Sequence, residues 1–324
     1  MEIAEVFDLV RADLDGVEAA LGRQSESAIE PVARVARYLQ SSGGKRLRPT
    51  LHLLAAGLCG YQGGAAIRLG AVLELVHTAT LVHDDVIDDA ATRRGRASAN
   101  RRWGNSLAVL AGDWIYMEAF RLALEERSLR ILDILTELTQ MMVEGELIQL
   151  TQLGRARVNE AEALDISRRK TACLFSTCLR LGAVLGKRPP VEEELLARYG
   201  LQVGMAFQIV DDLLDFIAEP ERLGKPVVND LREGKVTLPL VYALEKAPAE
   251  ARRKVETVLE EKEFRSVKPE EIIALVRESG AVERSRARAA EFLGDLAECL
   301  DPFPESSYKR ALESLPHFVL HRDY

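Results

Sequence analysis

Helical periodicity runs through almost the whole chain and limits its fold more than any other feature. Apolar residues recur at three- and four-residue spacings, and Gly or Pro interrupts them at intervals of about 15 to 30 residues. No stretch shows the sustained alternation between hairpin turns that marks strands, so no strands are expected. The pattern predicts an all-α chain with helices over residues 2–22, 28–41, 48–59, 64–90, 105–125, 129–153, 159–186, 191–219, 236–246, 249–261, 269–279, 281–300 and 304–321.

Composition and charge narrow the class of protein. No linker divides the 324 residues, so we expect one domain over residues 1–324, with its helices around a central cavity. The net charge of −8 argues against a nucleic-acid partner. The first residues are acidic and amphipathic rather than leader-like, and no apolar run has the length of ~18 residues that a transmembrane helix needs. Four cysteines without CxxC spacing indicate free core thiols in a reducing compartment. We therefore expect a cytoplasmic protein that makes at most transient contact with a membrane.

Two acidic clusters have almost the same sequence pattern, in LVHDDVIDDA and FQIVDDLLDF. On a helix, Asp84 and Asp88 share one face, as do Asp211 and Asp215, because residues four apart lie about 40° apart around the axis. The apolar run before each cluster places these carboxylates at the rim of a core, where they would repel one another without a cation. Oxygen ligands alone favour Mg²⁺, which keeps sites for phosphate oxygens. The clusters therefore predict a site for a metal-bound diphosphate; two solvated helix ends are the plainer alternative.

Basic segments accompany the acidic clusters. In GGKRLRP, the glycines let the backbone approach an anion, and a helix that begins near Leu47 adds partial positive charge. Lys45, Arg46 and Arg48 then make three cations in four positions, which indicates an anion cradle. Polar loops with Arg or Lys follow both acidic clusters, over residues 91–104 and 220–235. Arg93 lies in the first of these loops, and its guanidinium suits phosphate oxygens, although a solvated basic loop is the alternative.

Four further polar residues lie where helices are expected. His77 precedes Asp84 by two turns on the same face, where it is either a donor to phosphate or a satisfied core histidine. Lys170 and Thr171 stand where a helix passes from polar to buried. Gln208 precedes the second acidic cluster by one turn, where it is either a residue of the site or an ordinary helix glutamine.

Taken together, these segments resemble the trans-isoprenyl diphosphate synthases, the polyprenyl synthetase family, of the long-chain type. The resemblance runs through GGKRLRP, LVHDDVIDD, RRKT, GMAFQIVDDLLDF, LGKP, EGKVTLPL and FVLHRDY. It implies the isoprenoid synthase fold, with about ten core helices around a cavity, usually in a homodimer. It also implies a prenyltransferase that joins isopentenyl diphosphate head-to-tail to an allylic diphosphate with the help of Mg²⁺.

The resemblance assigns roles to individual residues. The diphosphate of isopentenyl diphosphate would contact Lys45, Arg48, His77 and Arg94. Three Mg²⁺ would bind the allylic diphosphate, two held by Asp84 and Asp88 and one by Asp211, with Asp85 and Asp215 acting through hydrogen bonds or water. The allylic diphosphate would also contact Arg93, Lys170, Lys225 and Lys235, with Thr171 and Gln208 near the reacting carbon. The family often has glycine where this chain has Val228, and we expect valine to avoid the backbone angles open to glycine.

Small side chains before the first acidic cluster predict a long product. Ala79 and Thr80 stand where short-product relatives commonly carry an aromatic ring, and Val76 lies one turn deeper. An open tunnel there would give about six to ten isoprene units (roughly C30–C50) on a farnesyl or geranylgeranyl primer, for quinone side chains. The alternatives are a shorter-chain farnesyl or geranylgeranyl diphosphate synthase and the catalytic subunit of a two-component heptaprenyl-type enzyme. A terpene cyclase and a non-catalytic partner subunit fit less well, since this chain keeps GGKRLRP and all of the motif aspartates.

Overall fold

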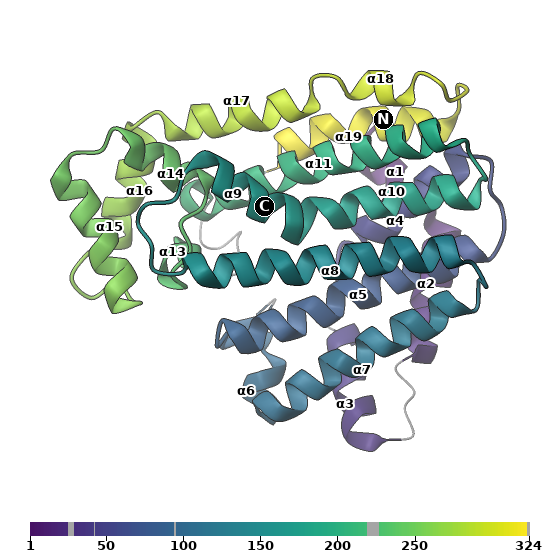
Figure 1. Ribbon diagram of the computed structural model, residues 1–324, viewed down its shortest axis with the longest axis horizontal. Helices are drawn as coiled ribbons and strands as arrows, with labels where there is room; N and C mark the ends of the chain where they lie inside the picture. The colour runs from purple at the N-terminus through teal and green to yellow at the C-terminus, as the bar shows by residue number, and fades with distance from the viewer. Residues whose placement is uncertain (25–28, 42, 94, 219–226, 323–324) are drawn as a thin grey trace. The chain divides into compact units, whose positions relative to one another are not determined.

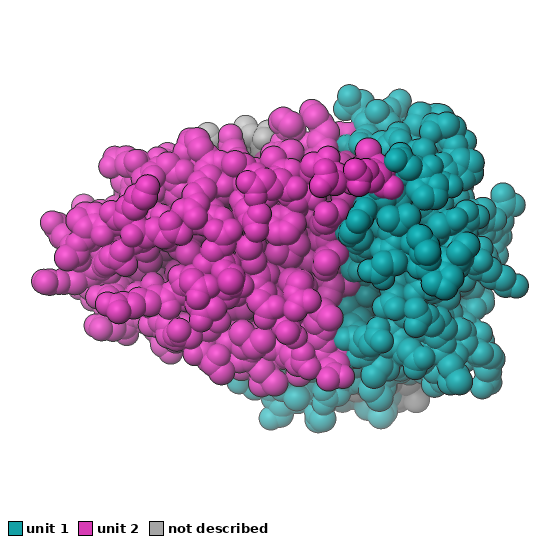
Figure 2. Space-filling model, turned by 45° about the horizontal axis from the view of Figure 1, so that its top comes forward, with its two compact units in different colours: residues 1–139, 174–200, 299–314 teal, residues 140–173, 201–298, 315–324 magenta. Residues whose placement is uncertain are grey.

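The computed structural model describes residues 1–24, 29–41, 43–93, 95–218 and 227–322, and these are helical almost throughout (Figure 1). The predicted all-α class is confirmed. The chain forms two compact units, coloured in Figure 2. Unit 1 comprises Met1–Thr139, Leu174–Gly200 and Cys299–Ser314; unit 2 comprises Gln140–Cys173, Leu201–Glu298 and Leu315–Tyr324. The single domain over residues 1–324 stays a prediction.

Unit 1 is organised around the apolar helix α5 (Ala65–Ile87). Leu69, Val72 and Val76 of α5 have no accessible surface, and burying each such side chain contributes roughly 1.5–3 kcal/mol. Its main neighbours are α7 (Asn105–Leu124), α4 (Leu47–Leu58) and α2 (Arg11–Gln24). The unit also contains α1 (Ile3–Leu9), α3 (Glu30–Ser41), α6 (Ala99–Trp103) and most of α10 (Cys173–Leu185).

Glycines without room for a side chain let helices of unit 1 approach closely. A Cβ at Gly182 of α10 would lie 2.6 Å from the Cβ of Ala55 and 2.7 Å from a backbone nitrogen of α4. A Cβ at Gly112 of α7 would lie 2.3 Å from the ring of His83 on α5. These contacts fix α10 against α4, and α7 against the end of α5 that carries the first acidic cluster.

Unit 2 combines the later parts of two long helices with several short ones. Its centre is α14 (Leu238–Glu245), which contacts α17 (Ala281–Leu293), α16 (Pro269–Glu278) and α9 (Glu160–Ser167). Arg284 lies over the Tyr242 ring at 3.7 Å and pairs with Glu245, so charge as well as apolar burial connects α17 to α14. Four helices run through both units: α8 (Leu129–Gln152), α11 (Pro190–Ile217), α18 (Leu296–Leu300) and α19 (Ser307–Leu320). Unit 2 also contains α13 (Asn229–Arg232) and α15 (Ala249–Glu261).

The structure differs from the predicted elements in several places. Thr92–Arg93 (β1) and Arg96–Ala97 (β2) form a short antiparallel ribbon where no strand was expected, because Gly95 at φ +73° supplies the turn. The helix predicted over 159–186 contains a π-helical turn, η1 (Arg168–Ala172). The helices predicted over 2–22 and 281–300 are each divided in two.

One described helix, α5, is long and apolar enough to cross a membrane by length and composition alone. Within the structure, 67% of its apolar window is buried, as in the core helix of a globular protein. The expected absence of a transmembrane segment stays a prediction.

Candidate active site

The first acidic cluster occupies the last turn of α5. Asp84 and Asp88 are half-buried one turn apart, and Asp88 caps the helix. Partial negative charge at this end of the helix adds to that of the carboxylates and favours a bound cation. Asp85 is 1% exposed and does not share their environment.

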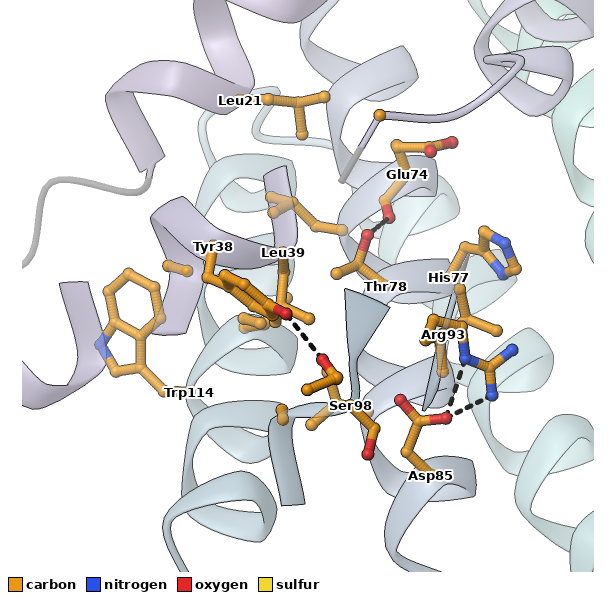
Figure 3. A pocket seen from close by; sticks show the side chains of 18 of the residues that line it. Leu21, Tyr38, Leu39, Glu74, His77, Thr78, Asp85, Arg93, Ser98 and Trp114 are labelled. Atoms are coloured by element: carbon orange, nitrogen blue, oxygen red, sulfur yellow. Dashed lines mark hydrogen bonds and ion pairs between the residues drawn. The ribbon is translucent and has the colours of Figure 1, made fainter. Parts of the chain in front are cut away.

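Asp85 is the ion-pair partner of Arg93 on β1. The Arg93 guanidinium donates from Nε (2.8 Å) and Nη2 (2.5 Å) to one carboxylate oxygen of Asp85 (Figure 3). Burial opposes the charged guanidinium, but the hydrogen bonds to Asp85 and the charges of Asp85, Asp84 and Asp88 raise the pKa of Arg93 overall. Arg93 therefore lies in the field of three of the four carboxylates of the cluster.

A pocket in unit 1 adjoins this ion pair. In Figure 3, His77 and Arg93 lie on one side of it, and the indole of Trp114 lies on the other. Leu21, Leu39 and other apolar side chains form much of the lining. A polar end beside an apolar wall suits a small ligand with a charged head and a hydrocarbon tail.

The GGKRLRP segment ends in α4, which begins at Leu47 as expected. Gly43 (φ +65°) and Arg46 (φ +49°) both adopt the left-handed conformation before the helix. Lys45 is exposed, and the half-buried Arg48 lies 5.6 Å from the centre of the Phe175 ring. The guanidinium of Arg46 is directed to two carboxylates, and the cradle of three cations stays a prediction.

The second acidic cluster lies near the end of α11. Asp211 is half-buried and pairs with Arg322 at 3.5 Å, and Arg322 also lies over the Phe207 ring. Asp212 is 7% exposed and Asp215 is fully buried. Burial, helped by the charge of Asp230, raises the pKa of Asp212 well above its usual range, although a hydrogen bond from Gln208 opposes the shift. Within this cluster, only Asp211 presents a carboxylate to the surface of its unit.

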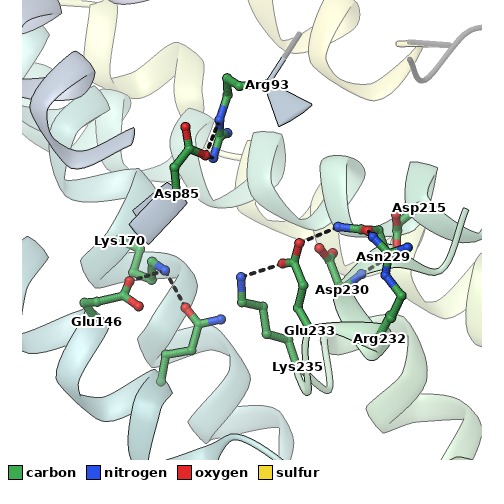
Figure 4. A network of polar contacts seen from close by, with 11 residues as sticks. Asp85, Arg93, Glu146, Lys170, Asp215, Asn229, Asp230, Arg232, Glu233 and Lys235 are labelled. Atoms are coloured by element: carbon green, nitrogen blue, oxygen red, sulfur yellow. Dashed lines mark hydrogen bonds and ion pairs between the residues drawn. The ribbon is translucent and has the colours of Figure 1, made fainter. Parts of the chain in front are cut away.

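Asp215 holds the start of the described segment that begins at residue 227. Its carboxylate accepts a hydrogen bond from the backbone nitrogen of Asp230 at 3.2 Å (Figure 4). Its backbone carbonyl accepts one from the backbone nitrogen of Val228 at 2.9 Å. Val228 adopts φ +54°, so the expectation that valine would avoid this conformation is wrong. Complete burial of its side chain offsets part of the backbone strain.

The π-helical turn η1 carries Lys170 and Thr171. Lys170 pairs with Glu146 and donates to Gln149, both on α8 (Figure 4). The Thr171 hydroxyl donates to the Gln208 carbonyl oxygen at 2.7 Å, so the structure brings these two predicted residues together. Such single π turns are frequent at functional sites because they redirect the side chains that follow.

Three predicted diphosphate-binding residues remain: Lys235 and Lys225 for the allylic diphosphate, and Arg94 for isopentenyl diphosphate. Lys235 pairs with Glu233 at 2.8 Å (Figure 4). Arg94 and Lys225 lie outside the described residues.

Comparison with known proteins decides the family. The model of the polyprenyl synthetase family matches residues 29–276. The chain belongs to the polyprenyl synthetase family. It is 36% identical over 323 residues to octaprenyl diphosphate synthase of Escherichia coli (strain K12), with all of both chains covered. It is also 34% identical to heptaprenyl diphosphate synthase component 2 of Geobacillus stearothermophilus, again over all of both chains.

A solved polyprenyl synthetase extends the match to the fold. The crystal structure of polyprenyl synthase from Caulobacter crescentus CB15, complexed with calcium and isoprenyl diphosphate, has a TM-score of 0.95 at 34% identity. The match covers 100% of this chain and 98% of that one. The family resemblance, the isoprenoid synthase fold and the prenyltransferase activity expected from the sequence are thus confirmed.

The three positions predicted to set product length in this polyprenyl synthetase differ in exposure. Val76 and Ala79 have no accessible surface, whereas Thr80 is half-buried. Thr80 follows His77 and precedes Asp84 on the same face of α5, and its hydroxyl donates to the His77 carbonyl at 2.7 Å. Of the three, Thr80 is therefore the one with surface open to a growing chain; their role in product length stays a prediction.

Several residues of the site were not predicted. Glu146, Gln149, Arg322 and Asp230 all contact predicted residues. Glu146 and Gln149 are three residues apart and therefore share one face of α8. This spacing is the one sequence feature that could have indicated that both contact the same residue. The contact of Arg322 with Asp211 joins residues 111 positions apart and has no local signature.

Proposed function

We propose that this polyprenyl synthetase joins isopentenyl diphosphate to farnesyl or geranylgeranyl diphosphate and makes a long all-trans product for quinone side chains. The observation that carries the proposal is the full-length match to a polyprenyl synthase complexed with isoprenyl diphosphate. The acidic and basic residues described above supply the charges that two diphosphates and their metal ions require.

The donor set fits Mg²⁺. Within the described residues, no three His, Cys, Asp or Glu side chains gather closely enough to hold a metal ion. Mg²⁺ does not need such a cage, since it usually binds through one or two carboxylates plus substrate phosphates. Asp84 and Asp88 offer such a pair, and Asp211 offers a single carboxylate. We propose three Mg²⁺ per site, two held by Asp84 and Asp88 and one by Asp211; when bound, they stabilise the diphosphate as a leaving group.

The cations of the chain hold the two substrates. Lys45, Arg48 and His77 bind the diphosphate of isopentenyl diphosphate, whose tail then lies against the apolar wall of the pocket. Arg93 and Lys170 bind the allylic diphosphate. The allylic C–O bond breaks with both electrons on oxygen, the isopentenyl double bond attacks the resulting cation, and a proton passes to the released diphosphate.

The hydroxyl of Thr171 and the amide of Gln208 act as fixed dipoles near the reacting carbon. Because Thr171 donates its proton to Gln208, its oxygen lone pairs remain available to face positive charge. Gln208 is held in turn by its hydrogen bond to Asp212 at 2.7 Å. This chain orients both groups before substrate arrives.

The proposal includes a second copy of the chain. Leu110 and Met117 on α7 are each 62% exposed and Leu124 is 48% exposed, at seven-residue spacing on one face. Apolar side chains repeated in this way favour association with another helix, and a homodimer would cover them. Light scattering should give twice the chain mass, and Leu110→Glu with Met117→Glu should give monomers; a monomeric parent chain would contradict this part.

One experiment tests the reaction. The purified chain, alone, with Mg²⁺, farnesyl diphosphate and isopentenyl diphosphate, should yield product of about six to ten isoprene units by chromatography. Asp84→Asn and Asp211→Asn should lower turnover by at least about a thousandfold and leave the circular dichroism unchanged. A product of three or four units would support a short-chain synthase. An inactive chain would point to a two-component enzyme, and full activity of either variant would refute the assigned site.

A further inference from the structure

Arg46 stands inside the cationic run GGKRLRP, yet two carboxylates of unit 1 neutralise it. Its Nη1 donates to Glu74 on α5 at 2.7 Å, and its Nη2 donates to Glu18 on α2 at 3.2 Å. Its Nε also donates to Glu18. The Arg46 side chain is only 15% exposed and that of Glu74 only 6%. A buried negative group beside a proposed anion site requires an explanation.

The backbone of Arg46 is part of the same arrangement. At φ +49° it adopts the left-handed conformation, which a non-glycine residue enters at a cost of about 1 kcal/mol. Its carbonyl accepts hydrogen bonds from the nitrogen (3.0 Å) and hydroxyl (2.8 Å) of the buried Thr50. The side chain and the carbonyl of Arg46 are therefore both held, and the exposed Lys45 directly precedes this fixed point.

Glu74 extends the arrangement to the other side of the proposed site. It lies one turn before His77 on α5, and its carbonyl accepts a hydrogen bond from the Thr78 hydroxyl at 2.8 Å. Glu74, His77 and Thr78 all line the pocket of Figure 3, as does Arg46. One ion pair thus joins the segment that carries Lys45 to the helix that carries His77.

We propose that Arg46 and Glu74 form a clamp that positions Lys45, Arg48 and His77 for the diphosphate of isopentenyl diphosphate, and that Arg46 does not contact that diphosphate. This inference rests on the proposed function. In the clamp, Arg46 has a second effect, because its charge masks Glu18 and Glu74 from the incoming anion. Removal of the guanidinium alone leaves both carboxylates to repel the diphosphate.

The test measures binding of isopentenyl diphosphate to the full chain by calorimetry, together with KM for each substrate and kcat. Arg46→Gly keeps the left-handed backbone at no steric cost and removes only the side chain. It should weaken isopentenyl diphosphate binding at least about tenfold, with KM for the allylic substrate and kcat changed less than about twofold. Adding Glu74→Gln to Arg46→Gly should recover at least about threefold of the lost affinity, since it removes one unmasked carboxylate.

The double variant separates the two roles of Arg46. If Arg46 binds the diphosphate itself, Arg46→Gly and Arg46→Gly/Glu74→Gln should bind equally weakly, and the clamp is refuted. Parental affinity in Arg46→Gly also refutes it. If the glycine variant does not fold, Arg46→Lys replaces it in the test. Lysine retains the charge but lacks the forked guanidinium that reaches two carboxylates. Arg46→Lys should bind isopentenyl diphosphate about threefold more weakly than the parent, and parental affinity would refute the clamp.

Two controls keep the inference distinct from the proposed function. Arg68→Gln breaks another ion pair of α5, the more exposed one to Glu126, whose two members do not line the pocket, and should leave binding unchanged. Lys45→Ala should weaken binding whether or not Arg46 acts as a clamp. If neither the parent chain binds isopentenyl diphosphate nor Lys45→Ala changes the result, the proposed function fails, rather than the clamp alone.

Discussion

His52 links the stability of unit 1 to pH. The imidazole lies on α4 with no accessible surface, and its Nδ1 is 3.0 Å from the carbonyl oxygen of Cys178 on α10. The close approach of α10 to α4 at Gly182 leaves little room for water to hydrate an added charge. Burial lowers the pKa of His52 from 6.5 to about 4 in the folded chain.

The sign and size of the effect follow from proton linkage. Between pH 6.5 and 4 the unfolded chain binds a proton at this histidine and the folded chain does not, so acid favours unfolding. The contribution to the free energy of unfolding is present above pH 6.5 and falls as the pH drops toward 4. The full loss is about 3 kcal/mol, since each unit of pKa difference corresponds to about 1.4 kcal/mol.

The assay compares the parent chain with His52→Gln, whose amide can still donate to the Cys178 carbonyl. Urea unfolding followed by tryptophan fluorescence reports on unit 1, because Trp103 and Trp114 both lie there. From pH 7.5 to 4.5 the stability advantage of the parent should shrink by about 2–3 kcal/mol relative to His52→Gln. A difference between the two proteins that is constant with pH would refute the argument that His52 is buried as neutral imidazole.

Three other perturbations test separate parts of the structure. Gly182→Ala should destabilise unit 1 by about 1–3 kcal/mol in urea unfolding, because its Cβ would meet Ala55 and backbone, whereas Gly64→Ala should change little. Thr80→Phe should shorten the product by several isoprene units in chromatography; an unchanged distribution would contradict an open face there. Lys170→Gln should raise KM for the allylic diphosphate about tenfold in initial-rate assays while KM for isopentenyl diphosphate stays constant, and a larger effect on the second substrate would reassign the lysine.

The elements that the sequence predicted well are those whose pattern is local. The apolar repeat of α5, the start of α4 at Leu47 and the two aspartate motifs near helix ends all follow from residues within a few turns of each other. Periodicity carries no information on the π turn at Arg168–Ala172 or on the ribbon after α5, since one extra residue per turn and a two-residue strand leave almost no pattern. Both lie beside residues assigned to the site.

The partners of the charged residues could not be predicted for a different reason. Arg46 is 28 positions from each of its two carboxylates, and Asp211 is 111 positions from Arg322. Such pairs depend on how helices pack, so a run of basic residues looks alike whether it faces an anion or a buried glutamate. Burial separates Asp85, Asp212 and Asp215 from the half-buried Asp84, Asp88 and Asp211, although the motif DDxxD does not distinguish them.

The ion pairs themselves explain how the chain tolerates so many charges before substrate binds. Arg93 is held by Asp85, Lys170 by Glu146 and Lys235 by Glu233, each within one unit. Asp211 is likewise held by Arg322. If these residues bind diphosphate and Mg²⁺ as proposed, binding exchanges one set of opposite charges for another, with phosphate replacing carboxylate and metal replacing guanidinium. The free energy of binding is then a difference between two compensated states, so removal of one member, as in Lys170→Gln, also leaves its partner carboxylate to repel the substrate.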